Sequence, residues 1–316
     1  MACLVCRSTR QAPLYTGVRD HYGVATGTFA FLRCDECGSA TLDPLPTPER
    51  LAALYVDDYT FKPGGSGASG PPGWLAELEW RLFYRRGYAA RLRIIRALTG
   101  VGTGRVLEVG CGSGLFLRFL RDAGYIVDGL ETSKTDVAYA RERFALEVRA
   151  GSLETVPLPA DAYDLALLVY VMEHMPDPHD ALARIRRALQ PGGWVVLGLP
   201  VIDSGQAWLL GARWSAVTEA PRHVLLPSFD GARRLLAAAG FRDVAAVPSP
   251  ALENAGHVAL SWLPGAATPL TAPRSTPGAL LRRLAGGLLL GPALLVAWAE
   301  RWPRGRAGTM FFCGRR

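Results

Sequence analysis

Short apolar runs alternate with helical patterns along most of the chain. Val106, Leu107 and Val109 form one such run, which is typical of a parallel strand covered on both faces. Further strands are predicted at residues 125–131, 146–149, 163–170, 194–200, 244–247 and 309–313. Helices are predicted at residues 47–55, 74–99, 179–189 and 229–239, and one more begins near residue 114. This alternation predicts an α/β fold.

Three glycines, Gly110, Gly112 and Gly114, follow the first of these runs at alternate positions. Glycine permits a tight turn and a close approach of the backbone to a ligand. The spacing differs from the dinucleotide fingerprint G-x-G-x-x-G, because the third glycine comes one residue early. Glu108, inside the strand, would repel a pyrophosphate. These features favour a ligand with a cationic amino-acid end and no phosphate.

The stretch E-V-G-C-G-S-G, which begins at Glu108, resembles motif I of the class I S-adenosylmethionine-dependent methyltransferases. The resemblance implies a Rossmann-like sheet of seven strands with helices on both faces, and S-adenosylmethionine as cofactor. It also implies that Glu108 holds the methionine ammonium group, directly or through water. In the same comparison the backbone of Gly110, Cys111, Gly112 and Gly114 lines the methionine tail.

Four further positions extend the cofactor site that the resemblance implies. Glu131 ends the second strand about 20 residues beyond the glycine turn, where a carboxylate can accept hydrogen bonds from both ribose hydroxyls. Ser152 stands where family members often carry an Asp that contacts the adenine amine, and Leu153 could pack on the adenine ring. We also assign Thr132 and Tyr170, at the ends of the second and fourth strands, to this site.

The string M-E-H-M-P-D-P, at residues 172–178, resembles the motif that follows the fourth strand in small-molecule methyltransferases. Within it, Glu173 and His174 alone make an incomplete metal site. Residues 219–228 are expected to face the substrate pocket, because that pocket lies at the carboxyl ends of the strands. His223 is therefore the first candidate for a catalytic base and His174 the second. Arg222 is the candidate ligand for an anionic part of the substrate.

Two cysteine pairs stand near the N-terminus, as Cys3-x-x-Cys6 and Cys34-x-x-Cys37. Four thiolates with this spacing can close a tetrahedral zinc site. The pattern predicts a zinc ribbon over residues 1–45. Its role should be structural rather than catalytic, because four protein ligands leave no open position.

Composition shifts divide the rest of the chain. Residues 46–100 are expected to form a linker and a helical cap, in which the Gly-, Ser- and Pro-rich stretch 62–73 is either a solvated linker or a lid. Residues 101–316 are expected to form the methyltransferase domain. It carries a helical insert at about 250–305, before the last strand.

Part of this insert, residues 279–304, is rich in leucine and flanked by arginines. Residues 284–299 carry no charge, but Gly291 and Pro292 interrupt the stretch. It is therefore too short and broken to span a bilayer. Contact with a membrane surface, a pocket for a lipid and a homodimer contact all remain open.

Charge and composition narrow the choice of function only slightly. The chain has 316 residues, 49% of them hydrophobic, and a net charge of +7. The arginines are spread without a long basic run, so this charge does not by itself indicate nucleic acid. The N-terminus shows no secretory signal pattern, and no stretch of about 18 apolar residues is uninterrupted. We expect a cytoplasmic location with reduced thiols, with peripheral contact at the inner face of the membrane left open.

Together these motifs predict transfer of a methyl group from S-adenosylmethionine to a hydroxyl of a sugar, a lipid-linked glycan or a secondary metabolite. Methylation of rRNA or tRNA, C-methylation of a nucleotide sugar and non-catalytic binding are the alternatives. An intact Glu108, glycine turn and Glu131 argue against the last of these.

Overall fold

The computed structural model describes residues 1–21, 23–55, 81, 84–263, 277–300 and 305–316, with the side chains of 277–287 left out. The stretch 62–73, interpreted as linker or lid, lies outside the described residues. So do the beginning of the helix predicted at 74–99 and two flanking arginines of the insert, Arg301 and Arg304, whereas Arg282 and Arg283 lie in a described helix with their side chains left out.

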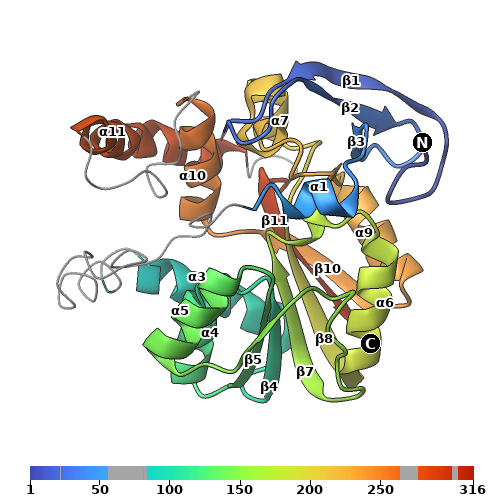
Figure 1. Ribbon diagram of the computed structural model, residues 1–316, viewed down its shortest axis with the longest axis vertical. Helices are drawn as coiled ribbons and strands as arrows, with labels where there is room; N and C mark the ends of the chain where they lie inside the picture. The colour runs from blue at the N-terminus through green and yellow to red at the C-terminus, as the bar shows by residue number, and fades with distance from the viewer. Residues whose placement is uncertain (22, 56–80, 82–83, 264–276, 301–304) are drawn as a thin grey trace.

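A seven-stranded sheet forms the centre of the molecule (Figure 1). Its strands are β4 (Arg105–Val109), β5 (Ile126–Glu131), β6 (Val148–Ala150), β7 (Tyr163–Val169), β8 (Leu189–Pro200), β10 (Arg242–Pro248) and β11 (Thr309–Arg315). Their order is β10-β11-β8-β7-β4-β5-β6, and β11 runs antiparallel to both of its neighbours. This confirms the predicted sheet. The strand predicted at 194–200 begins earlier, at Leu189, because it continues to pair with Tyr163 of β7.

Helices cover both faces of this sheet (Figure 1). On one face α3 (Arg85–Thr99) and α4 (Leu115–Asp122) pack apolar side chains against β4, β7 and β8. On the other face lie α6 (Pro178–Ala188) and α9 (Phe229–Ala238). A fifth helix, α5 (Lys134–Phe144), packs against α4 and β6. Both faces are therefore apolar, as the uninterrupted apolar runs predicted.

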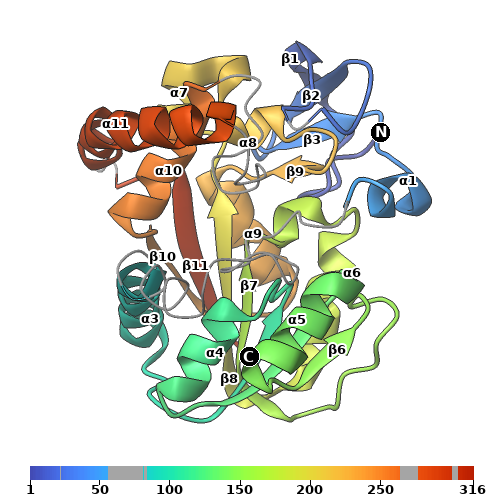
Figure 2. The ribbon, with the colours of Figure 1, turned by 60° about the vertical axis from the view of Figure 1, so that its left-hand side comes forward.

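The N-terminal residues form a second, antiparallel sheet of β1 (Gln11–Val18), β2 (Phe29–Cys34) and β3 (Ala40–Asp43). Its fourth strand, β9 (Leu225–Leu226), comes from the segment after β8 and pairs with β3 (Figure 2). The expected ribbon is thus joined by backbone hydrogen bonds to the segment that carries Arg222 and His223. A helix of one turn, α1 (Pro48–Ala52), follows, with the Thr47 hydroxyl accepting a hydrogen bond from Arg50 N.

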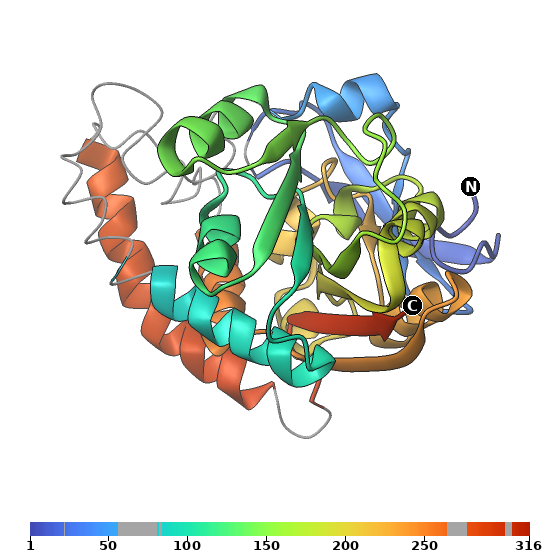
Figure 3. The same ribbon diagram turned by 90° about the horizontal axis from the view of Figure 1, so that it is seen from below.

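The insert before β11 contains α10 (Ala251–Ser261) and α11 (Pro277–Ala299). Small residues of the two helices, Ala255 and Ala259 on α10 and Ala293 and Ala297 on α11, allow them to pack closely. Within the described residues, no helix is both long and apolar enough to cross a membrane. Figures 1 and 3 show the insert on the opposite side of the molecule from the N-terminus. Between β8 and β9 lie the short helices α7 (Gly205–Leu210), η3 (Gly211–Arg213) and α8 (Ser215–Thr218).

Candidate active site

The glycine turn lies at the carboxyl end of β4. Gly110, Gly112 and Gly114 have φ angles of 65°, 52° and 76°, in the left-handed region that favours glycine. A Cβ atom on Gly110 would lie 2.5 Å from Val171 Cγ2, so a side chain there would collide with its neighbour. Gly110 N donates to Leu130 O at 2.7 Å, which ties the turn to β5. The result is a backbone surface at the sheet edge that a ligand can approach closely.

Glu131, at the end of β5, points toward this turn. Its Oε2 accepts a hydrogen bond from Gly112 N at 2.8 Å. Its Oε1 accepts from Ser133 N at 2.9 Å and from the Thr132 hydroxyl at 3.2 Å. A carboxylate has about four lone-pair sites, so these bonds fix its orientation and leave room for a ligand hydroxyl. The structure thus brings together Glu131, Thr132 and the glycine turn, as the sequence predicted.

Glu108 lies inside β4 and is buried. Its Oε2 has no hydrogen-bond partner among the described residues. Burial raises the pKa of this carboxyl to about 8, against an opposing effect of the Arg91 guanidinium. A buried carboxylate that lacks a partner is costly unless a ligand supplies one. The Glu108 carboxyl group therefore fits the ammonium group of a bound amino acid.

The two residues expected near an adenine ring lie just after β6. Gly151 N donates to Glu131 O at 2.8 Å, which places this turn beside the end of β5. Ser152 N donates to the Thr155 hydroxyl at 2.9 Å. Leu153 is buried in the core with Leu130. The adenine contacts of Ser152 and Leu153 stay predictions.

Tyr170, directly after β7, joins three elements. Its φ of 59° is unusual for a residue with a side chain. The Tyr170 hydroxyl donates to Glu253 Oε2 of α10 at 2.9 Å, and Glu253 Oε1 accepts from Arg91 Nε of α3 at 3.1 Å. The Arg91 guanidinium lies over the Phe116 ring of α4, 4.9 Å from its centroid. Sequence analysis missed Arg91 and Glu253, because no local motif marks either residue.

His174 and His223 lie side by side although 48 residues separate them in the chain. Their ring centroids are 4.7 Å apart, and His174 ends the short 3-10 helix η2 (Met172–His174). Burial lowers the pKa of each imidazole to about 3. Both rings are therefore neutral, and they are weak proton acceptors in this state. Their roles as catalytic bases stay predictions.

Arg222 does not face an open pocket. Its side chain is fully buried, and Nη2 lies 2.7 Å from Oδ1 of Asp20, which is also fully buried. Nε lies 3.8 Å from Glu219 Oε1. The expectation that Arg222 binds an anionic substrate is corrected here, because its guanidinium is engaged inside the protein. The side chain joins the N-terminal sheet to the segment after β8.

The four cysteines of the N-terminal pairs lie close together. Cys3 Sγ is 3.5 Å from Cys37 Sγ, Cys6 Sγ is 3.4 Å from Cys34 Sγ, and all four sulfurs lie within 4.8 Å of one another. Zn–S bonds of about 2.3 Å place tetrahedral sulfurs about 3.8 Å apart, so the cluster fits zinc. The Cys3 thiol hydrogen bond lowers the pKa of Cys37 to about 4. All six cysteines are described, and none forms a disulfide.

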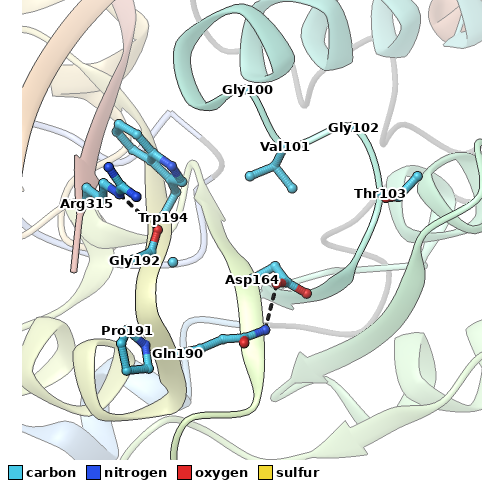
Figure 4. Close-up of a pocket in the computed structure, with 11 residues that line it drawn as sticks. Gly100, Val101, Gly102, Thr103, Asp164, Gln190, Pro191, Gly192, Trp194 and Arg315 are labelled. Atoms are coloured by element: carbon cyan, nitrogen blue, oxygen red, sulfur yellow. Dashed lines mark hydrogen bonds between the residues drawn. The ribbon is translucent and has the colours of Figure 1, made fainter.

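A cavity of about 390 Å³ lies at the end of the central sheet opposite the glycine turn (Figure 4). Val101, Asp164, Gln190, Trp194 and Arg315 are among the residues that line it. These residues lie just before or near the start of the parallel strands β4, β7 and β8, or at the end of the antiparallel β11. The cavity therefore lies at the amino ends of the parallel strands. The glycine turn and Glu131 are at the carboxyl ends, where ligands of such sheets bind. This cavity is therefore separate from the candidate site.

The central part of the chain is similar in sequence to known methyltransferases. The sequence pattern of the methyltransferase domain family matches residues 82–246. A ubiquinone biosynthesis O-methyltransferase from Bradyrhizobium diazoefficiens is 33% identical over 138 residues, which are 40% of this chain and 54% of the relative. A malonyl-[acyl-carrier protein] O-methyltransferase from Serratia marcescens is 33% identical over 132 residues, 40% of this chain and 51% of the relative. The chain thus spans about half the length of these relatives.

A solved S-adenosylmethionine-dependent methyltransferase from Thermotoga maritima is 27% identical to this chain. The likeness covers 56% of this chain and 81% of that one, with a TM-score of 0.44. The matched family segment contains the glycine turn, Glu131, Tyr170 and the His174–His223 pair. It leaves out β1, β2 and β3 of the N-terminal sheet and the insert.

Proposed function

We propose that this chain, which belongs to the methyltransferase domain family, transfers the methyl group of S-adenosylmethionine to a hydroxyl group. The observation that carries the proposal is the pair of carboxylates on either side of the glycine turn. Glu108 is buried with an oxygen that lacks a partner, and Glu131 is held in place by Gly112 N and Ser133 N. One suits the ammonium group of the cofactor and the other its ribose hydroxyls.

In this reaction the main task of the protein is to position the cofactor and the acceptor. The sulfonium methyl group is already electrophilic, so the nucleophile must be aligned with the methyl–sulfur bond and lose its proton. Both relatives named above are called O-methyltransferases, which supports an oxygen atom as the acceptor. We propose a sugar, a lipid-linked glycan or a secondary metabolite as its source. This acceptor would enter at the carboxyl ends of β7 and β8, the side of such sheets on which ligands bind.

Transfer of a labelled methyl group from S-adenosylmethionine to candidate acceptors tests the proposal. Activity with a hydroxylated small molecule or glycan, lost in Glu131→Ala, would support it. Activity with RNA alone, together with RNA that stays bound at high salt during purification, would favour the RNA alternative. Methyl transfer to carbon of a nucleotide sugar would keep the family and change the acceptor atom.

We also propose that Cys3, Cys6, Cys34 and Cys37 bind a zinc ion. The short sulfur–sulfur distances and the absence of a disulfide among the six cysteines support zinc binding. The site would be structural, since all four coordination positions come from the protein. Zinc would hold β2 and the preceding N-terminal residues together and so stabilise the sheet that pairs with β9.

Several large apolar side chains are exposed on the insert and on the neighbouring helix α7. Leu288, Leu295 and Trp298 of α11 are exposed, as is Trp208 of α7. The two helices meet at Gln206, whose Nε2 donates to Glu300 Oε1 at 2.7 Å. We propose that this apolar surface contacts an anionic membrane, with a second copy of the chain as the competing occupant. Membrane contact would suit a lipid-linked acceptor.

A further inference from the structure

Glu173, in the short helix after β7, is a buried carboxyl group that the proposed methyl transfer does not use. The residue is 1% exposed, and neither of its side-chain oxygens has a hydrogen-bond partner among the described residues. Its backbone is tied to the segment before β9, since Val224 N donates to Glu173 O at 2.9 Å. A carboxyl group left this way in the interior is unstable unless a proton or a cation is bound to it.

His174 and His223 each bring a ring nitrogen close to the Glu173 carboxyl group. His174 Nδ1 lies 3.1 Å from Arg222 O, and His223 Nδ1 lies 2.7 Å from Ala216 O. A carbonyl oxygen only accepts hydrogen bonds, so each Nδ1 carries the proton and each Nε2 carries the lone pair. Backbone carbonyls that fix the tautomer in this way are the usual support for metal-binding histidines.

A fourth acceptor faces this group. His223 Nε2 lies 3.5 Å from Glu219 Oε2, so a neutral ring and a carboxylate turn acceptor atoms toward each other. Side-chain ligand atoms of Glu173, His174 and His223 all lie within 4.8 Å of one another. Bonds of about 2.0–2.2 Å to a metal bring ligand atoms to about 3–3.5 Å from each other, so a bound ion would draw these side chains closer together.

We propose that Glu173, His174 and His223 bind a divalent transition-metal ion, with Glu219 as a fourth ligand. Imidazole nitrogens and carboxylate oxygens are the donor set that Zn²⁺, Fe²⁺ and Mn²⁺ accept. The ligands come from two segments, the helix after β7 and the turn before β9, so the ion would also join these segments. The site is distinct from the cysteine cluster, which belongs to the N-terminal sheet.

The site lies near the proposed cofactor site. The Tyr55 ring packs against the edge of His174, with centroids 5.9 Å apart. Burial raises the pKa of Tyr55, and the carboxylates of Glu219, Glu173 and Glu131 add to this effect. The charges of both the proposed metal-binding residues and the ribose-binding Glu131 thus reach Tyr55. If the proposed methyl transfer is correct, an ion here would polarise the acceptor hydroxyl and assist its deprotonation.

Equilibrium titration of Zn²⁺ into the full chain, with the cysteine cluster already loaded, tests the site without any methyl donor. We expect one further Zn²⁺ per chain. Glu173→Gln and His223→Gln should weaken this second site at least about 100-fold, because loss of an outer-sphere partner alone costs 10- to 100-fold. Cys34→Ser should lose the first zinc and retain the second.

His179→Gln is the matched control. His179 is a half-buried histidine whose Nε2 lies 3.0 Å from Val5 O, outside the group. This variant should retain the second site, and circular dichroism should show that Glu173→Gln is folded. A wild-type chain that takes up neither Zn²⁺ nor Mn²⁺ beyond the cysteine-bound ion would overturn the proposal. Equal uptake by Glu173→Gln would do the same, and Glu173 would then carry a proton instead.

Discussion

Asp20 and Arg222 form an ion pair that is completely buried, with Arg222 Nη2 2.7 Å from Asp20 Oδ1. Asp20 follows β1 of the N-terminal sheet, and Arg222 precedes β9. Leu42 N of β3 also donates to Val224 O, and Val224 N donates to Glu173 O. The N-terminal sheet is therefore part of the wall that holds the His174–His223 pair, rather than a separate appendage.

The first prediction concerns this ion pair. Asp20→Asn should lower the free energy of unfolding by about 3–5 kcal/mol, because it removes the nearer of the two carboxylates that neutralise the buried Arg222 guanidinium. Chemical denaturation measures the change. Asp35→Asn, an exposed Asp of the same sheet region, is the control and should change stability by less than about 0.5 kcal/mol. A loss below about 1 kcal/mol in Asp20→Asn would mean that the pair contributes little.

The second prediction concerns the cysteine cluster. Elemental analysis should find zinc in the cluster, and Cys34→Ser should lose that zinc and destabilise the N-terminal sheet. Affinity for S-adenosylmethionine should be largely retained, because Glu108 and Glu131 belong to the central sheet. Cys313→Ser, which removes a buried thiol from β11, is the control and should retain the zinc. A wild-type protein with intact thiols and no zinc would refute the assignment.

The third prediction concerns the apolar surface of the insert. The chain should float with anionic vesicles at low salt, and high salt should reduce flotation. Replacement of Leu288, Leu295 and Trp298 by serine should abolish it, since these side chains are exposed rather than packed on α10. Ile126→Ser removes an exposed apolar side chain of β5 and should have no effect. A chain that stays in solution and forms a dimer, which the triple variant dissociates, would show that a second copy covers the surface.

The fourth prediction is a pH dependence. The Glu108 pKa is about 8 in the folded chain and 4.5 as its ordinary value, so between these values the folded state retains a proton that the unfolded state releases. Glu108 therefore makes the free energy of unfolding fall as pH rises from about 4.5 to 8, by at most about 1.4 kcal/mol per pH unit, and contributes no slope above 8. Denaturation of ligand-free wild type and Glu108→Gln at pH 5, 7 and 9 measures the difference. Parallel curves for the two proteins would contradict it.

Local patterns predicted the sheet, the glycine turn and Glu131, because each depends on residues close together in the chain. The contacts around them could not be predicted in this way. Arg91 and Glu253 are 162 residues apart, and Asp20 and Arg222 are 202 residues apart. The pairing of β9 with β3 involves only two residues of β9, too few to show a strand pattern. For the same reason the sequence presented Arg222 as a substrate ligand, although its partner is inside the protein.

Calorimetric titration with S-adenosylmethionine tests the central claim most directly. The wild-type chain should bind S-adenosylmethionine and should not bind NAD. Glu131→Ala should weaken binding by about 1.5–3 kcal/mol, because it removes charged acceptors for the ribose hydroxyls. Glu147→Ala, an exposed carboxylate beside β6, should leave affinity unchanged. Absence of binding by the wild type, or equal affinity in Glu131→Ala, would contradict the assignment of the cofactor to the glycine turn.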